Sequence, residues 1–245
     1  ALFNEFDLCL SSSNESKKHL NLLGANNIKY IGNLKFTELE TNKDSLEINL
    51  RKFFLSKKIW CASSTHKTEE EIAAKVHIKL KKKDKNTLTI IIPRHINRVT
   101  EIKNNLEKLN LKVHIYSSMN KIPDDTDIYL VDAYGKTKMF FSICYTVFLG
   151  GSLIKHGGQN PLEAARYGCK ILHGPNIWNF YEIYNLLNKI KVSYKVNNVI
   201  QIAEKIGLVS INSQNTKSIK SKLETLSARI LKLTLKEINY FIYKK

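Results

Sequence analysis

Short apolar runs alternate with amphipathic stretches along almost the whole chain. Near-continuous apolar runs predict strands, and apolar positions that recur every three or four residues predict helices. The predicted strands are 6–13, 28–34, 58–64, 87–93, 112–118, 127–133, 146–151 and 169–174. The predicted helices are 14–24, 68–82, 96–109, 136–145, 160–168, 179–190 and about 215–243. This alternation predicts an α/β fold with a parallel sheet that is covered by helices on both faces.

The alternation breaks once, over residues 37–57, which are polar and only weakly periodic. We therefore interpret residues 1–40 as the end of one domain and 41–57 as a linker. Residues 58–215 form a second domain in this interpretation, and 216–245 form a C-terminal helical segment. Because the first residues already have the pattern of mid-domain structure, we expect the chain to be the back part of a longer protein.

Four predicted strands run into polar or glycine-rich residues at their carboxyl ends. These ends are Ser63-Ser64-Thr65-His66, Pro93-Arg94-His95, Asp132-Ala133-Tyr134-Gly135 and Gly150-Gly151-Ser152. Open parallel sheets bind their ligands in the crevice at the carboxyl ends of the strands. The pattern therefore predicts that these four ends converge on one ligand.

Four of the ten glycines lie between positions 150 and 158, as the pairs Gly150-Gly151 and Gly157-Gly158. Glycine after a strand allows a sharp turn and a close approach of the backbone to a ligand. A helix starting near Asn160 or Pro161 would then present free amides to an anion, with Glu163 able to accept hydrogen bonds from ribose hydroxyls. A plain tight turn with a capping carboxylate is the alternative for the same residues.

The other polar clusters have both a structural and a functional interpretation. Thr65 or Thr68 is suited to cap the helix that follows, with the glutamates at 69–71 favoured in its first turn. His66 has no second ligand at metal-binding spacing, so we expect no metal site. Arg94 is suited to bidentate contact with a phosphate or carboxylate, although a surface salt bridge explains it equally well.

The net charge of +17 predicts attraction to anions such as nucleic acid, anionic lipid or phosphorylated substrates. Scattered lysines that merely solvate the surface explain the same charge. The chain has no GxSxG, GxxxxGK[ST] or GxGxxG motif, and aromatic residues do not alternate with basic ones. We therefore expect no specific nucleic-acid binding.

Two further features bear on the compartment of the protein. The four cysteines, at 9, 61, 144 and 169, have no CxxC spacing, and three of them lie in apolar runs, which indicates reduced, buried thiols in an intracellular protein. The most apolar window, 139–154, is shorter than the roughly 20 residues that span a bilayer. We expect no membrane-spanning helix in these residues.

Six segments together resemble one known family. They are IGNLKF, WCASSTHKTEEE, IIPRH, VDAYG, FLGGSLIKHGGQNPLEAARYG and HGPNIWNF. In order and approximate spacing they resemble the Kdo (3-deoxy-D-manno-octulosonic acid) transferases of lipopolysaccharide synthesis, from residue 1 to about 190. The GGQNPLE block is the specific part of this similarity.

The resemblance implies a two-domain GT-B glycosyltransferase that needs neither a metal ion nor a cofactor. Such an enzyme transfers Kdo from CMP-Kdo to the lipid A precursor, lipid IVA, at the cytoplasmic face of the bacterial inner membrane. Residues 58–215 would be its Rossmann-like CMP-Kdo-binding domain, and 1–40 the end of its N-terminal acceptor domain. The implied partners are CMP-Kdo, the lipid A precursor, the anionic membrane surface and the remainder of the N-terminal domain.

The resemblance also implies roles for particular residues. Lys35 matches a lysine that stabilises charge in the transition state. The residues implied to contact CMP are Pro93, Arg94, Tyr134, Gly135, Lys136, Asn160, Pro161, Leu162 and Glu163. The strand ends add possible donor contacts at Ser64, Thr65, His66, Gly150, Gly151, Ser152, Gly157 and Gly158.

The chain departs from the family pattern at three places. Lys136 stands where the family usually has a glutamate, and Thr68 stands where it usually has a glycine. The segment that carries the general-base glutamate and the membrane-anchoring helix is not among the 245 residues. We therefore expect a fragment, or the product of a decaying gene, that binds the donor without turning it over, and that meets the membrane peripherally or through that segment.

Two other functions remain open on the sequence. One is a GT-B transferase that uses a different nucleotide sugar. The other is a noncatalytic basic module that binds nucleic acid or membrane through charge alone, for which steep salt dependence without nucleotide preference is expected. Protection by CMP, but not by UMP or GMP, would favour the Kdo transferase over both.

Overall fold

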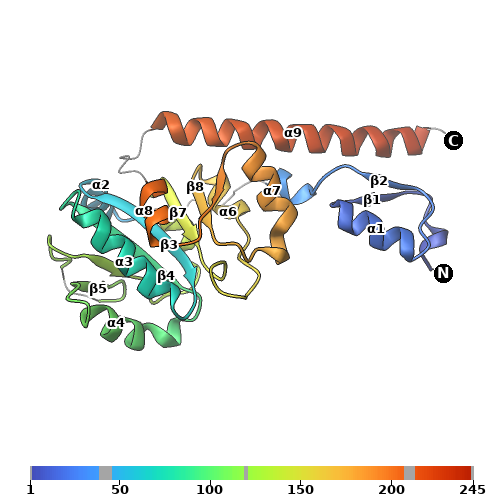
Figure 1. The fold of residues 1–245 in the computed structure, drawn as a ribbon. Helices are drawn as coiled ribbons and strands as arrows, with labels where there is room; N and C mark the ends of the chain where they lie inside the picture. The colour runs from blue at the N-terminus through green and yellow to red at the C-terminus, as the bar shows by residue number, and fades with distance from the viewer. Residues whose placement is uncertain (1, 39–45, 119–120, 207–212, 244–245) are drawn as a thin grey trace. The chain divides into compact units, whose positions relative to one another are not determined.

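The chain forms two compact units in a computed structural model that describes residues 2–38, 46–118, 121–206 and 213–243 (Figure 1). Residues 1–41 and 221–245 make up the smaller unit, and residues 42–220 make up the larger one. We placed a domain at 58–215 and a linker at 41–57. Of that linker, residues Ile48–Leu55 form helix α2, whose Phe54 has no exposed surface.

A seven-stranded sheet forms the centre of the larger unit. Its strands are β3 (Lys58–Thr65), β4 (Thr87–Pro93), β5 (Val113–Ile115), β6 (Ile128–Leu130), β7 (Thr146–Leu149), β8 (Lys170–His173) and β9 (Ser193–Lys195). Their order is β5-β6-β4-β3-β7-β8-β9, and every neighbouring pair is parallel. The prediction of an α/β fold built on a parallel sheet is confirmed. Strand β9 is absent from the sequence prediction, because its three residues, SYK, have no apolar run.

Helices follow most of these strands. They are α3 (Glu69–Lys81), α4 (Val99–Glu107), α5 (Thr137–Phe141), α6 (Leu162–Arg166), α7 (Tyr181–Lys189) and α8 (Val199–Ile206), with short 3-10 turns η3 (Ile96–Arg98) and η4 (Trp178–Phe180). Helix α6 is shorter than the predicted 160–168. It ends before Gly168, which has a left-handed φ of +80° and so cannot continue the helix.

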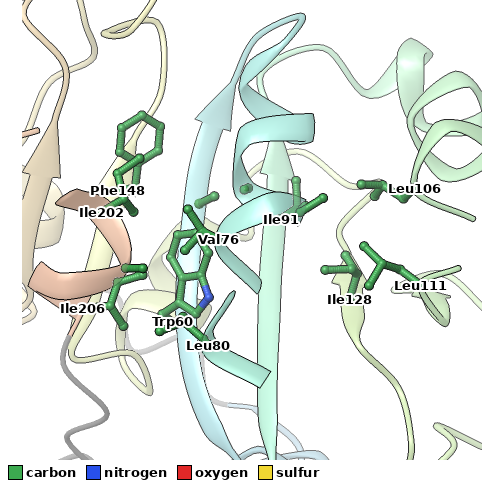
Figure 2. Close-up of a cluster of buried hydrophobic side chains, with 14 of the residues drawn as sticks. Trp60, Val76, Leu80, Ile91, Leu106, Leu111, Ile128, Phe148, Ile202 and Ile206 are labelled. Carbon is green, nitrogen blue, oxygen red and sulfur yellow. The ribbon is translucent and has the colours of Figure 1, made fainter. Parts of the chain in front are cut away.

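Two apolar layers hold these helices on the sheet. On one face, Trp60 of β3 packs among side chains of α3, β4 and α8 (Figure 2). On the other, Phe54 of α2 meets Tyr129 of β6 and Phe140 of α5 edge to face, with ring centroids 5.0 and 6.0 Å apart. Burial of large side chains on both faces explains why β4 and β7 carry apolar residues on both of their faces.

The smaller unit contains η1 (Leu2–Glu5), β1 (Cys9–Ser11), α1 (Asn14–Leu22), β2 (Ile28–Tyr30) and η2 (Leu34–Thr37). Strands β1 and β2 pair in parallel, with Cys9 opposite Ile28. The long helix α9 (Ser213–Tyr243) begins in the larger unit and continues into the smaller one, where Ser227 donates a 2.6 Å hydrogen bond to the carbonyl of Phe36. Among the described helices, none combines the length and apolar composition of a membrane crossing.

Candidate functional site

The order of the strands reverses at β3, so the switch point of the sheet lies at the carboxyl ends of β3 and β7. From β3 the chain moves to β4 on one side and later returns to β7 on the other. Ligands of open parallel sheets usually bind at this switch point, which is called the crevice below. The loops after β3, β4 and β7 carry three of the four polar strand ends singled out from the sequence, and the fourth follows β6.

A buried carboxylate joins the loops that follow β3 and β7. Glu69, the first residue of α3, is fully buried and accepts backbone hydrogen bonds from Gly151 (2.7 Å), Ser152 (3.1 Å) and Leu153 (3.0 Å). It accepts a fourth from the backbone N–H of His66, at 3.0 Å. These amides are therefore already bound by a carboxylate of the protein. A contact of Gly151 or Ser152 with a donor substrate remains a prediction, and it would have to use atoms other than these backbone N–H groups.

Gly150 is required by the close approach of these two loops. A Cβ atom built at Gly150 would lie 2.4 Å from the carbonyl oxygen of Ser64 and 2.7 Å from the Cα atom of Thr65. Both are backbone atoms that cannot move aside. Glycine here serves loop packing, whereas the sequence interpretation attributed the glycine pair to the approach of a ligand.

Three histidines from three loops surround the crevice. The ring of His66, after β3, lies 4.1 Å between centroids from that of His156 and 5.7 Å from that of His95. His66 is buried, whereas His95 and His156 are exposed. Burial, together with the nearby basic groups His156, His95 and Arg94, lowers the pKa of His66 to about 4. The described residues contain no group of three His, Cys, Asp or Glu side chains arranged to hold a metal ion.

Backbone contacts connect two of the predicted CMP-binding residues, Pro93 and Arg94, to the end of β3. Arg94 is exposed, and its backbone N–H donates to the carbonyl of Thr65 at 2.9 Å, so the ends of β3 and β4 are joined. Pro93 ends β4, opposite Thr65 in the sheet. Ser64 has a left-handed φ of +54° at the irregularity in this pairing.

The glycine-rich loop after β7 folds back on itself, so that its end contacts its beginning. The backbone N–H of Gly158 donates to the carbonyl of Gly151 at 2.8 Å, while Gly157 and Gly158 both have a left-handed φ. Asn160 accepts a hydrogen bond from the backbone N–H of Leu162 at 3.1 Å, and Pro161 directly precedes α6. Asn160 thus contacts the start of α6 from one residue before the N-cap position, which Pro161 occupies.

The side chain of Glu163 contacts the start of α5, directly after the turn that follows β6. Its Oε2 accepts a 3.1 Å hydrogen bond from Thr137, and its Oε1 lies 3.8 Å from the ammonium of Lys138. Thr137 directly follows Lys136, so the predicted contacts 134–136 and 160–163 lie together. Tyr134 and Gly135 are exposed.

Lys136 also lines a pocket of about 690 Å³ at the β5–β6 edge of the sheet. Its other lining residues include Phe53, His114, Tyr116 and Tyr129. This pocket was not predicted, because helix α2, which forms one of its walls, lies in the segment that we interpret from the sequence as a linker. Lys35, the remaining predicted site residue, lies in η2 of the smaller unit, where its backbone N–H donates to Asn33 Oδ1 at 3.0 Å.

Thr68 has a backbone conformation that suits glycine. It precedes α3 with φ +80° and ψ −28°, a left-handed geometry that is unfavourable for a β-branched residue. We expect Thr68→Gly to raise the free energy of unfolding by about 1 kcal/mol, measured by urea denaturation. Thr100→Gly, at an exposed position inside α4, is the matched control and should lower it. Equal effects of the two substitutions would contradict the strain at Thr68.

Comparison with curated proteins finds relatives over most of the chain. The chain is 31% identical over 222 residues to the 3-deoxy-D-manno-octulosonic acid transferase of Haemophilus influenzae, covering 88% of this chain and 52% of that protein. It is 35% identical over 179 residues to the enzyme of the same name from Rickettsia bellii, covering 72% of this chain and 42% of that protein. The chain thus spans about half the length, or less, of these relatives. No protein-family model matches it.

Two solved structures share the fold. The C-terminal CMP-Kdo binding domain of WaaA from Acinetobacter baumannii superimposes with a TM-score of 0.60 at 24% identity, covering 75% of this chain and 93% of that domain. A putative UDP-N-acetylglucosamine 2-epimerase from Listeria monocytogenes also gives 0.60, at 13% identity, covering 98% of this chain and 61% of that one. Both superpositions show that the chain shares the α/β fold of these two proteins.

Proposed function

Because this chain is a homologue of the Kdo transferases over most of its own length, we propose that its larger unit binds CMP-Kdo for transfer of Kdo to a lipid A precursor. The observation that carries the proposal is the convergence of the family motifs at the switch point of the sheet. Residues 63–66, 93–95 and 150–163 come from three separate strand ends, yet backbone and side-chain hydrogen bonds link them.

The proposed chemistry is displacement at the anomeric carbon of Kdo, with CMP as the leaving group. Negative charge gathers on the departing phosphate, and an exposed guanidinium at the end of β4, that of Arg94, is suited to neutralise it. Glu163, held beside the turn 134–136, is suited to accept hydrogen bonds from the ribose. Lys35 would stabilise charge at the reacting centre, as the family motif implies.

Other parts of the reaction lie outside these residues in our proposal. The acceptor hydroxyl needs a general base, and we infer that a glutamate of a preceding N-terminal segment supplies it. The smaller unit would then be the end of the acceptor-binding domain. The net charge of +17 supports work at the anionic cytoplasmic face of the inner membrane, where the acceptor lipid is also anionic. We therefore expect residues 1–245 to bind CMP but to transfer no Kdo without that segment.

Nucleotide selectivity tests this proposal. We expect calorimetric titration at moderate salt to detect binding of CMP and much weaker binding of UMP and GMP. Arg94→Ala should weaken CMP binding by about 10- to 100-fold, because it removes a charge-assisted contact with the phosphate. Arg51→Ala, which removes an exposed arginine of α2, is the matched control and should leave binding unchanged.

The outcomes separate the alternative functions. Preference for UMP or GMP would indicate a GT-B transferase with another donor. Equal and steeply salt-dependent binding of all three nucleotides would indicate a basic module that acts through charge alone. Loss of binding in Arg51→Ala as large as in Arg94→Ala would overturn the assignment of Arg94.

A further inference from the structure

We propose that His95 and His156, arranged around the buried His66, bind the carboxylate of the donor sugar and so select a sugar acid. This inference rests on the proposed function, because it assigns a second anionic group of the same donor to its own receptor. It assigns a role to the side chains of His95 and His156, of which the sequence interpretation placed only His95 among the strand ends that converge on a ligand.

The first argument is the geometry of the three rings. His66, His95 and His156 follow β3, β4 and β7, so they come from the three loops that border the crevice. The exposed rings of His95 and His156 contact the buried ring of His66, at centroid distances of 5.7 and 4.1 Å. Gly151 lies against two of these rings. A Cβ atom there would be 2.9 Å from Cδ2 of His156 and 3.3 Å from Nε2 of His66.

The second argument is the electrostatics of the crevice. Burial is the largest cause that lowers the pKa of His66, and the basic groups His156, His95, Arg94 and Arg98 lower it further. The two buried carboxylates nearby already have partners in the protein. Glu69 binds the backbone amides of the loop after β7, and Glu70 accepts from both terminal nitrogens of Arg98, at 3.0 and 3.5 Å. The histidines therefore form a basic group that a bound anion would complement.

The third argument is the chemistry of the donor. Kdo is an acid, and in CMP-Kdo the carboxylate and the phosphate ester are attached to the same carbon. A site for this molecule therefore needs two adjacent groups of donors for two adjacent anions. Arg94, His95 and His156 all lie close enough to His66 to act on it electrostatically, so a phosphate held by Arg94 would place the carboxylate within reach of the histidines. Imidazole N–H groups make charge-assisted hydrogen bonds to carboxylates.

The test compares CMP-Kdo with CMP on the 245-residue chain. We expect the wild-type protein to bind CMP-Kdo more tightly than CMP in calorimetric titration. The double variant His95→Asn/His156→Asn should weaken CMP-Kdo binding by about 10- to 100-fold and leave CMP binding nearly unchanged. His156→Lys, which places an ammonium donor at the site, should retain part of the preference. His19→Asn removes an exposed histidine of α1 and is the matched control.

The possible outcomes distinguish this inference from the proposed function. If wild-type protein binds CMP but shows no preference for CMP-Kdo, or if the double variant keeps the preference, the carboxylate site is wrong and the proposed function stands. If the wild-type protein binds neither molecule, the proposed function itself fails. Thermal unfolding of each variant is measured in parallel, and His95→Gln/His156→Gln replaces the asparagine variant if that variant unfolds early.

Discussion

Glu69→Gln is expected to lower the free energy of unfolding of the larger unit by about 3 kcal/mol. The carboxylate of Glu69 is fully buried and accepts from four backbone amides, those of His66, Gly151, Ser152 and Leu153. A glutamine offers one accepting oxygen and directs an NH₂ donor at amides that are themselves donors. Buried donors without acceptors cost about 1–3 kcal/mol each, less whatever the loop recovers by relaxing.

Urea denaturation of wild type and variant measures this effect. Glu71→Gln, two residues further along α3, changes the same side chain at an exposed position and should alter stability by less than about 0.5 kcal/mol. The loops after β3 and β7 should also loosen in Glu69→Gln, so CMP binding should weaken in this variant and not in the control. A Glu69→Gln protein as stable as the control would mean that the four amides find other acceptors.

Much of the larger unit could be predicted because local patterns determine it. Strands β4 and β7 are mostly apolar, β3 is apolar from Ile59 to Ala62, and their neighbours are amphipathic helices. Parallel order then follows from the alternation of strands and helices. The same reasoning located the polar strand ends at one edge of the sheet, since carboxyl ends of parallel strands share an edge.

The internal role of Glu69 could not be predicted, because its partners are distant in the sequence. Three consecutive glutamates at a helix start have a local explanation in capping and the helix dipole. The partners of Glu69 lie 82–84 residues away, in a loop whose glycines suggested a ligand. The sequence interpretation gave Gly151 and Ser152 possible contacts with the donor, and the structure adds that their backbone N–H groups are bound by Glu69.

The histidine cluster was predicted only in part, for a related reason. His66 and His95 belong to strand ends that were expected to converge, but His156 is 61 positions from His95 and lies in none of those ends. Only the curvature of three loops brings the rings together. One signal was present in the sequence: His156 lies between two glycine pairs, where the backbone is already shaped for a close approach. Helix α2 was missed because its surroundings are polar, although the adjacent Phe53 and Phe54 indicated a buried anchor.

Asp127→Asn is expected to destabilise the larger unit by about 3 kcal/mol at neutral pH. Asp127 is buried before β6 and binds His77 at 3.1 Å, the backbone N–H of Lys112 at 2.9 Å, and the ammonium of Lys81. Burial acts to raise the pKa of Asp127, but these three partners outweigh it and hold the pKa below its usual range. Removing one member of a buried, hydrogen-bonded charge network leaves the others uncompensated.

The pH dependence distinguishes this network from simple packing. A carboxyl group whose folded pKa is depressed stabilises the fold fully above the unfolded pKa, about 3.9, and loses that contribution as pH falls through the folded value. The deficit of Asp127→Asn relative to wild type should therefore be constant between pH 7 and 5 and shrink below about pH 4. Asp125→Asn, which removes an exposed carboxylate paired with Lys112, is the matched control and should change stability little. A deficit for Asp127→Asn that stays constant down to pH 2 would show that the charge of Asp127 is not what stabilises the fold.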